Sequence, residues 1–497
     1  MIGVILAAGV GSRLRPMTND KPKCLVTTAG KTIIQYQIDA YKNAGINELV
    51  IVIGYEGGAV RDYCKHIKGM KISIIENEIY EDTNNMYSLY LVREHLEGQG
   101  FILNNADVSI DKEVVRLLSE SPSENAVAVD TSIYNEESMK VSLCDDGYVN
   151  DISKKIKRSE SVACSIDFYK FSKEGAQVFM EQVRKIIEDE KNTKDWTEVA
   201  LQRLFNSGEL KFKICDIKGL NWVEIDNYDD LALSDRIFSE FDKKIVKIEN
   251  FIFDLDGTVY VGSNPVAHAK ETINYLKSAG KNIFFISNNS SKSKEDYVRR
   301  LSIMGINIDV NQIVLSTDAL VHYLRENNVF NIHVLGTNSF KKTLQNEGFN
   351  VDSESPEYVV IGYDTELNYQ KLVMACKHIN DGVDFLATHC DMFCPSEFGP
   401  IPDIGSIIEM INLTTGVSPK KIFGKPSQEM IKHLVDSSDI NIERTIVVGD
   451  RLHTDVLMAK NMSCFSLLVL TGESTRDQLE KSDIKPDFVL SSIANII

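Results

Sequence analysis

Residues 2–25, IGVILAAGVGSRLRPMTNDKPKCL, decide the fold that we predict for the first half of this 497-residue chain. Residues 2–6 form a short apolar run that breaks into a glycine-containing segment, a pattern typical of a buried strand that leads into a loop. Gly9 and Gly11 have no Cβ atoms, so the backbone N–H groups of the loop can approach a polyphosphate closely. This stretch therefore predicts a strand followed by a phosphate-binding loop.

Two positively charged side chains follow the glycines. Arg13 and Lys23 can supply charge to phosphate oxygens, which become more negative while a phosphate-containing group is transferred. A glycine turn with a purely structural role is the alternative. We favour the phosphate-binding loop because the whole stretch, and not only a GxG pair, carries the pattern.

Signals for strands and helices then alternate along the chain. The expected segments are a helix over 33–43 that ends at Gly45, strands at 49–53, 71–75 and 101–103, and a helix within EDTNNMYSLYLVREHL that is entered through Asn84 and Asn85. This alternation predicts an α/β fold with a Rossmann-like, doubly wound sheet. Ligands collect beyond the carboxyl ends of the strands in such a sheet, so Gly9, Asn104 and Asp107 are expected to converge on one cleft.

The composition is that of a globular protein. Hydrophobic residues make up 43% and charged residues 25% of the chain, and the length suffices for about three or four compact units. A formal net charge of -18 disfavours general binding to nucleic acid or to an anionic membrane, because phosphate groups would be repelled. The opening apolar run lacks a basic leader, and no apolar stretch is long enough to span a bilayer. Nine scattered cysteines fit free thiols, so we expect a cytoplasmic protein.

Two aspartates in the first half are candidates for a metal site. Asp107 follows the expected strand FILNNAD, and Asp226 lies in NWVEIDNYDDL, far along the chain. Mg²⁺ prefers oxygen ligands and usually keeps several waters, so two carboxylates and a phosphate oxygen would suffice to hold it. The alternative is that Asp107 caps a helix and Asp226 begins a turn.

The pattern LAAGxGxRLxPxTxxxPKxL resembles the signature of the nucleoside-triphosphate transferases. Over about residues 1–235 the chain is similar to bacterial phosphocholine cytidylyltransferases, and the segments that carry this similarity are YEDTNNMYSLYLV, NNAD and WVEIDNYDDL. The resemblance implies transfer of CMP from CTP to a small phosphorylated alcohol, with release of pyrophosphate. It implies Asp107 and Asp226 as Mg²⁺ ligands and Arg13 and Lys23 as catalytic residues. The implied nucleotide-binding residues are Leu6, Ala7, Ala8, Gly9, Gly11, Ser12, Arg13 and Lys23. Aromatic side chains that could frame a quaternary amine, although such residues are more often core, are Tyr87, Phe168, Tyr169 and Trp196.

A second unit begins with FIFDLDGTVYVG. Residues 251–253 form an apolar run that predicts a strand, and Asp254 and Asp256 lie two positions apart just past its end, so both carboxylates can face one site. Two such carboxylates repel each other unless a cation lies between them or one is protonated. Phosphoryl-transfer chemistry uses both a cation held between two carboxylates and a carboxyl group that is protonated.

This opening resembles the first motif of the haloacid dehalogenase superfamily, and the other motifs follow in order as FFISNNS, FGKPS and IVVGDRLHTD. The resemblance implies that Asp254 attacks phosphorus to form an aspartyl-phosphate, and that Asp256 protonates the leaving alcohol and later activates water. Ser287 and Lys425 would bind the phosphoryl group. The implied Mg²⁺ ligands are Asp254, the Asp256 carbonyl and Asp450, with Asp455 in support.

More than a hundred residues separate Ser287 from Lys425, and the strands expected in VFNIHVLG and EYVVIGY predict an α/β cap over about 328–415. This arrangement resembles the nitrophenylphosphatase and phosphoglycolate phosphatase-like class, whose cap loop reads close to ATNPDxxxPxxxGxxPGxGS. Here the loop reads ATHCDMFCPSEFGPIPDIGS, with His389 in place of Asn and Asp403 in place of Gly. His389, Cys390 and Cys394 lie close together, but without a second CxxC-like pair we expect a cap-loop role rather than a metal site.

We therefore predict a bifunctional Mg²⁺-dependent enzyme with a nucleotidyltransferase domain at 1–240, a linker at 241–250 and a capped phosphatase at 251–497. The phosphatase is expected to act on a second phosphate ester in the same surface-polymer pathway, because hydrolysis of the acceptor would waste it. Alternatives are a sugar-1-phosphate nucleotidyltransferase that uses UTP or another nucleotide, and a phosphatase-like domain that serves as a binding module. The sequence leaves the oligomeric state open, with a homo-oligomer among the alternatives.

Overall fold

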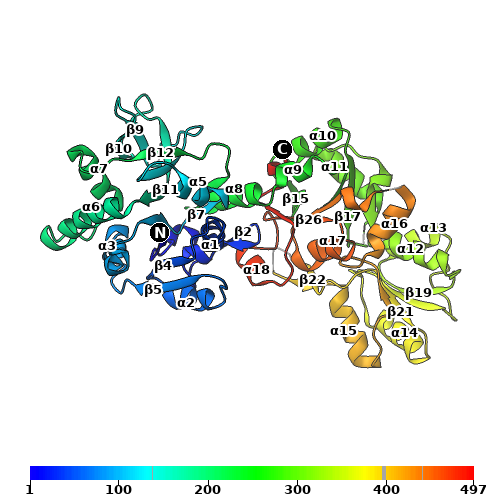
Figure 1. Ribbon diagram of the computed structural model, residues 1–497. Coiled ribbons are helices and arrows are strands. Elements are labelled where there is room, and N and C mark those ends of the chain that lie inside the picture. Colours follow the sequence, from blue (N-terminus) through cyan, green and yellow to red (C-terminus); the bar gives the residue numbers. More distant parts are fainter. Residues whose placement is uncertain (137, 291, 395–398, 439) are drawn as a thin grey trace. The chain divides into compact units, whose positions relative to one another are not determined.

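The computed structural model describes residues 1–136, 138–290, 292–394, 399–438 and 440–497. The chain divides into two compact units, residues 1–239 and residues 240–497. Each unit has its own sheets (Figure 1). Each unit also has its own apolar cores.

The first unit is built on a nine-stranded mixed sheet whose main path runs β10-β9-β11-β6-β1-β4-β5, with β8 paired to β11 and β12 paired to β8. Its strands are β1 (Ile2–Ala7), β4 (Glu48–Ile53), β5 (Lys71–Glu76), β6 (Phe101–Asn105), β8 (Ala126–Asp130), β9 (Lys140–Leu143), β10 (Val149–Ser153), β11 (Ala163–Phe171) and β12 (Lys213–Asp216). The strand β1 is buried along its whole length and pairs in parallel with β4 and β6. An apolar strand without alternation is typical of a parallel sheet covered on both faces.

Helices and short ribbons complete this unit. The helices are α1 (Ile33–Asn43), α2 (Gly57–Lys65), α3 (Asn85–Leu91), α4 (Arg93–Leu96), α5 (Glu113–Glu120), α6 (Lys173–Arg184), α7 (Thr197–Ser207) and α8 (Tyr228–Phe238). The ribbons pair β2 (Thr27–Thr28) with β3 (Lys31–Thr32) and β7 (Val108–Ile110) with β13 (Trp222–Glu224). The helix expected over 33–43 and the expected strands are confirmed. The single helix expected after Asn84 is two helices, because the chain breaks at Val92.

The second unit contains a six-stranded parallel sheet in the order β18-β17-β14-β25-β26-β27. Its strands are β14 (Asn250–Asp254), β17 (Asn282–Ser287), β18 (Ile313–Leu315), β25 (Thr445–Gly449), β26 (Phe465–Val469) and β27 (Phe488–Leu490), and its helices are α9 (Phe241–Ile245), α10 (Ala269–Ser278), α11 (Lys294–Ile303), α12 (Ser316–Glu326), α16 (Glu429–Ser438), α17 (Leu457–Asn461) and α18 (Arg476–Lys481). A small ribbon pairs β15 (Tyr260–Val261) with β16 (Asn264–Pro265). The predicted Rossmann-like fold is confirmed for both units.

A cap with a four-stranded parallel sheet is inserted in the second unit, in the order β19-β20-β21-β24. Its elements are β19 (Ile332–Leu335), α13 (Asn338–Asn346), β20 (Tyr358–Ile361), α14 (Tyr369–Asn380), β21 (Phe385–Ala387), the hairpin β22 (Phe393–Cys394) and β23 (Ile401–Pro402), α15 (Ile404–Thr415) and β24 (Lys421–Ile422). Because β24 pairs with β21, the cap sheet extends past residue 415, where we expected the cap to end. The part of the cap loop at 395–398 lies outside the described residues.

The segment 241–250, expected as a linker, lies in the second unit. It contains α9 and the first residue of β14, and the buried Phe241 ring packs edge-on against Phe488. Among the described residues, the helices are too short or too polar to cross a membrane.

Candidate functional sites

A pocket of about 320 Å³ opens in the first unit where β1 ends and the glycine loop begins. Leu6, Ala7, Ala8 and Gly9 form one part of its wall, together with Lys23 and Asp107. A Cβ atom at Gly9 would meet nothing within 4 Å, so the loop backbone borders open space. Gly11 serves another purpose: its φ is +64°, and a Cβ there would lie 2.7 Å from the Cβ of Lys23. The loop thus presents its backbone to the pocket and packs closely under Lys23.

Lys23 lies between the two predicted metal ligands. Its Nζ atom is 2.8 Å from Asp226 Oδ1 and 3.2 Å from Asp107 Oδ2, and Arg13 Nη1 is 2.9 Å from Asp226 Oδ2. Burial opposes the charge on Lys23, but the attraction of both aspartates outweighs it and raises the pKa of the amine. Lys23 is therefore a fixed positive charge at the edge of the pocket.

Glu224 joins the aspartates, a residue that the sequence analysis did not single out. Oxygen atoms of Asp107, Glu224 and Asp226 lie within 4.8 Å of one another. Burial, followed by the negative charges of Asp107 and Asp226, raises the pKa of Glu224 to about 7. Three carboxyl groups face two positively charged side chains, Lys23 and Arg13, so a negative charge remains when all three are ionised and the oxygen donor set fits Mg²⁺.

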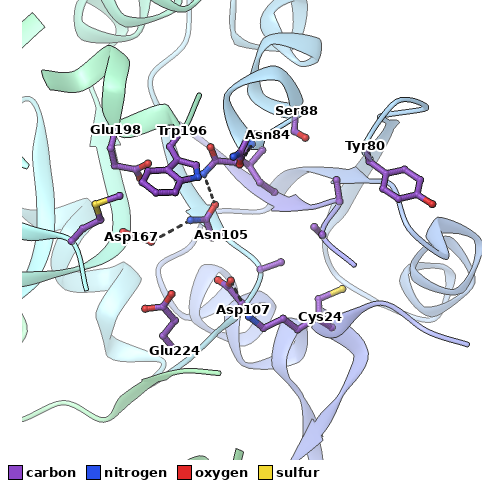
Figure 2. Close-up of a pocket in the computed structure, with 18 of the residues that line it drawn as sticks. Cys24, Tyr80, Asn84, Ser88, Asn105, Asp107, Asp167, Trp196, Glu198 and Glu224 are labelled. Atoms are coloured by element: carbon purple, nitrogen blue, oxygen red, sulfur yellow. Dashed lines mark hydrogen bonds and ion pairs between the residues drawn. The ribbon is translucent and has the colours of Figure 1, made fainter. Parts of the chain in front are cut away.

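The far side of the pocket is acidic. Figure 2 shows Asp167, Glu198 and Glu224 on the side opposite Tyr80, with Asp107 between the two sides. Asp167 lies where the pairing of β11 with β8 shifts register, and its φ is +59°, so this bulge turns its carboxyl group toward the pocket.

Hydrogen bonds join the acidic groups. The Tyr169 hydroxyl is 2.9 Å from Glu198 Oε1 and 3.1 Å from Asp167 Oδ1, and Asn105 Nδ2 donates to Asp167 Oδ2 at 3.2 Å. Burial, and then the charge of Glu198, raises the pKa of Asp167 well above its usual range, and burial raises the pKa of Glu198. Among the described residues, no ion pair is recorded for either group. Lys154 lines the same pocket, and its charge partly opposes the rise in the pKa of Glu198. A second positively charged group would favour the ionised form of Asp167 and Glu198.

One expectation about this pocket is corrected, and most of the aromatic residues considered for an amine have the alternative role in the core. Asn104 is buried on the other face of β6, where its amide bonds Gln37 and its oxygen accepts from Tyr41, and the next residue, Asn105, lines the pocket instead. Of the four aromatic residues considered for an amine, only Trp196 lines the pocket, with 45% of its surface exposed. Tyr87, Phe168 and Tyr169 pack in the apolar cores.

The second unit brings its predicted motifs together at the carboxyl ends of β14 and β25. Lys425 Nζ bonds Asp254 and lies 2.7 Å from Asp455 Oδ1, and all three side chains are at least nine-tenths buried. Oxygen atoms of Asp254, Asp450 and Asp455 lie within 4.8 Å of one another. Asp455, expected only in support, is thus a full member of the cluster.

The electrostatics of this cluster fit a bound cation. Burial, only partly offset by Lys425, raises the pKa of Asp254 to about 8, and burial together with Asp455 raises that of Asp450 to about 6. The buried Oδ1 atom of Asp450 has no hydrogen-bond partner within the described part of the chain. A buried carboxylate oxygen without a partner is costly, and Mg²⁺ would satisfy it.

The other two predicted catalytic residues border this cluster. Asp256 is exposed, two residues beyond Asp254. The Ser287 hydroxyl accepts from the backbone N–H of Asn289 at 3.2 Å and lies 3.2 Å from the hydroxyl of buried Tyr297. Tyr297 belongs to none of the sequence motifs. Only the structure shows that this residue of α11 lies beside Ser287.

Comparison with known proteins accounts for both units. Residues 2–234 match the nucleotidyl transferase family, residues 251–350 match the haloacid dehalogenase-like hydrolases, and residues 422–496 match a second hydrolase model of that superfamily.

Similar proteins are phosphatases. An acid sugar phosphatase from Staphylococcus saprophyticus is 29% identical over 249 residues, which is 50% of this chain and 96% of that protein. A 4-nitrophenylphosphatase from Thermotoga maritima is 39% identical and covers 50% of this chain and 96% of its own, with a TM-score of 0.49. A glycerol phosphate phosphatase from Mycobacterium tuberculosis, solved with magnesium, is 24% identical and covers 51% of this chain and 78% of its own, with a TM-score of 0.48. The chain thus joins an N-terminal nucleotidyl transferase domain to a C-terminal half that belongs to the haloacid dehalogenase-like hydrolases.

Proposed function

We propose that the first half transfers CMP from CTP to a small phosphorylated alcohol that also carries a positively charged amine. The acidic side of the pocket carries this proposal, because Asp167 and Glu198 have no recorded ion-pair partner among the described residues and lie beside the exposed ring of Trp196. An ammonium group would be attracted by both carboxyl groups when they are ionised. It would share the face of the indole ring with Lys154, whose Nζ atom lies 5.6 Å from the ring centroid. A neutral sugar phosphate offers no such charge.

The reaction follows from the order of groups along the pocket. The nucleotide phosphates would lie along the backbone of residues 7–9, and the acceptor would lie toward Asp167 and Glu198. An oxygen of the acceptor phosphate attacks the α-phosphorus of CTP, the bond to the β-phosphate oxygen breaks, and pyrophosphate leaves. Lys23 would turn from Asp107 and Asp226 to the phosphate oxygens and stabilise the negative charge that develops there.

Asp107 and Asp226, with Glu224 close by, are the residues that would hold Mg²⁺ in this site. In the second half, these residues are Asp254, Asp450 and the Asp256 carbonyl, and Asp455 lies near enough to contribute. When bound, Mg²⁺ neutralises phosphate charge in both sites.

We propose that the second half hydrolyses a phosphate monoester through its own aspartates. A carboxylate oxygen of Asp254 attacks phosphorus, and the alcohol leaves with a proton from Asp256. Water, deprotonated by Asp256, then hydrolyses the aspartyl-phosphate and frees inorganic phosphate. Lys425 and Ser287 would hold the phosphoryl oxygens. The alternative, a binding module without turnover, is disfavoured by the close cluster of Asp254, Lys425 and Asp450.

A matrix of nucleotides and acceptors tests the first activity. CTP, UTP, ATP and GTP are each paired with phosphocholine, phosphoethanolamine and glycerol phosphate, and pyrophosphate release is measured. We expect the highest rate with CTP and an amine-bearing acceptor. Equal rates with UTP would contradict the cytidine assignment and favour the alternative, a sugar-1-phosphate nucleotidyltransferase, while leaving the transferase class intact.

A further inference from the structure

The side chain of Asn288 lies where three distant segments of the second unit meet. Asn288 directly follows Ser287 at the end of β17, Asp391 lies in the cap loop after β21, and Lys425 lies after β24, where the chain leaves the cap. Asn288 is 7% exposed, so its amide group needs partners from the protein. These partners come from both of the other segments.

Both amide atoms of Asn288 bond the backbone of Lys425. Oδ1 accepts from the Lys425 N–H at 2.7 Å, and Nδ2 donates to the Lys425 carbonyl at 3.3 Å. A residue of a neighbouring antiparallel strand would make the same two bonds, which together fix the position of the Lys425 backbone. Nδ2 carries a second hydrogen and also donates to Asp391 Oδ2 at 3.1 Å. One side chain thus holds the Lys425 backbone and the cap loop at the same time.

We propose that Asn288 is a positioning residue of the phosphatase, and that through it the contact with Asp391 in the cap loop controls the placement of the Lys425 amine. This inference rests on the phosphatase activity proposed for the second half. Lys425 Nζ bonds Asp254 and lies 2.7 Å from Asp455 Oδ1, so a shift of the Lys425 backbone would move this charge relative to the reacting carboxylate. A charge stabilises a transition state only when it is already in place.

Close packing around Lys425 transmits a shift instead of absorbing it. A Cβ atom at Gly424, the residue before Lys425, would lie 2.6 Å from Asn288 Oδ1 and 2.7 Å from the Thr388 carbonyl oxygen. Glycine at this position therefore lets Asn288 and the cap loop approach the chain closely. The Asn288 carbonyl also accepts from the Ser316 hydroxyl at 2.8 Å, at the start of α12. A movement of the cap loop would reach Lys425 through these contacts.

Asp391 is held from the core and from the cap. In the core, Arg451 Nη1 lies 3.9 Å from Asp391 Oδ2, and Arg451 Nε lies 2.9 Å from Glu473 Oε2. In the cap, the Asp391 carbonyl accepts from the Gly405 N–H at 2.8 Å, in the first turn of α15. The Asp391 side chain is 14% exposed, so water competes little for its oxygens. This carboxylate therefore links α15 of the cap to Asn288 of the core.

Two simpler roles for Asn288 make different predictions. If Asn288 only stabilises the local fold, its loss would lower the Tm, and the folded protein would keep its kcat. If Asn288 holds Lys425 but the cap loop has no part, loss of the Asp391 carboxylate would leave turnover unchanged.

Hydrolysis of 4-nitrophenyl phosphate by the full-length protein with Mg²⁺, below the Tm of every variant, tests the link. Asn288→Ala and Asp391→Ala should each lower kcat at least about fivefold, and the double variant should be less than about twofold slower than Asn288→Ala, because both changes break one link. Asp391→Asn should keep at least about half of the kcat, since its amide oxygen can still accept from Asn288. Ser406→Ala is the matched control and should keep the wild-type kcat, because it removes another bond of the cap loop, from Ser406 Oγ to the Met392 carbonyl at 2.6 Å.

A binding measurement tests the same link without turnover. Orthovanadate with Mg²⁺ serves as an anion for the phosphoryl site, and hydrogen exchange is followed by mass spectrometry in peptides that contain residues 388–392. Because coupling between two sites is reciprocal, vanadate should slow exchange in these peptides at least about threefold in the wild type. It should not do so in Asn288→Ala or in Asp391→Ala.

The outcomes separate the role of Asn288 from the proposed activity. Absence of 4-nitrophenyl phosphate hydrolysis by the wild type would contradict the phosphatase activity, and the exchange measurement would then decide the role of Asn288. Four results would overturn that role: an unchanged kcat in Asn288→Ala, an unchanged kcat in Asp391→Ala, additive losses in the double variant, or vanadate protection that is absent from the wild type or equal in all three proteins.

Discussion

Replacement of Asp167 by Asn should weaken the use of an amine-bearing acceptor and leave the use of CTP unchanged. Asparagine is the matched substitution, because it keeps the shape of the side chain and tolerates the φ of +59° recorded at this position. Its amide oxygen can still accept from Asn105. The substitution therefore removes mainly one negative charge from the acidic side of the pocket.

The size of the effect follows from the burial of the group. A carboxylate and an ammonium about 4 Å apart attract each other by about 4 kcal/mol at an effective dielectric constant near 20. Part of this attraction is lost because burial and Glu198 raise the pKa of Asp167. When no acceptor is bound, the Asp167 carboxyl group must therefore release a proton before it can pair with the ammonium group. We expect a net loss of about 2 kcal/mol, roughly a 30-fold decrease in kcat/KM for the acceptor.

The assay is pyrophosphate release with saturating CTP and varied acceptor, repeated with saturating acceptor and varied CTP. In the wild type, KM for an amine-bearing acceptor should fall as the pH rises through the raised pKa of Asp167, because ionised Asp167 binds the cation and neutral Asp167 does not. The variant should lose this dependence and should use glycerol phosphate as well as the wild type does. An equal loss with the neutral acceptor would refute the reasoning, since the charge would then not be the cause.

Four further outcomes are expected. Lys23→Ala should lower pyrophosphate release at least about 100-fold, because it removes roughly 3 kcal/mol of charge stabilisation. Phosphatase turnover should stay near wild type. A parallel fall in phosphatase turnover would show that the two sites are coupled. Asp254→Asn should abolish phosphate release and leave CTP consumption unchanged. If the wild type rapidly hydrolysed the best acceptor of the transferase, the hypothesis that the two sites act on separate substrates would be contradicted. Tyr297→Phe should lower phosphatase kcat about tenfold through the lost contact with Ser287, with no further effect in Ser287→Ala. The pKa of Asp254 is raised to about 8 and that of Asp450 to about 6, so the stability of the metal-free second half falls as the pH rises through those values. Mg²⁺ should therefore raise the Tm of the second half more at pH 8.5 than at pH 5.5. Scanning calorimetry would measure both shifts.

Local sequence signals predicted much of the fold. Spacing of apolar residues and the residues that begin loops are properties of neighbouring positions in the sequence. They therefore predicted the strand before Gly9, the helix over 33–43 and the strand before Asp254. Motif order also placed Lys425 and Asp450 with Asp254, more than a hundred residues away.

Strand register decided which side chains face the pocket. Adjacent residues of a strand point to opposite faces, and the pairing of β6 with β1 and β11 sends Asn104 to the core and Asn105 to the pocket. No local pattern distinguishes these two asparagines.

The acidic side of the pocket and the contact between Cys394 and Asp403 were decided by the tertiary structure alone. Asp167 reaches the pocket through a bulge in β11, and Glu198 comes from the first turn of α7, yet one hydroxyl bonds both. Cys394 and Asp403 meet because β22 and β23 pair as a hairpin. The sequence by itself determined the two enzyme classes, since each motif is a short run with its own spacing. Selection of the acceptor depends on contacts between distant segments, which exist only after the sheets have formed.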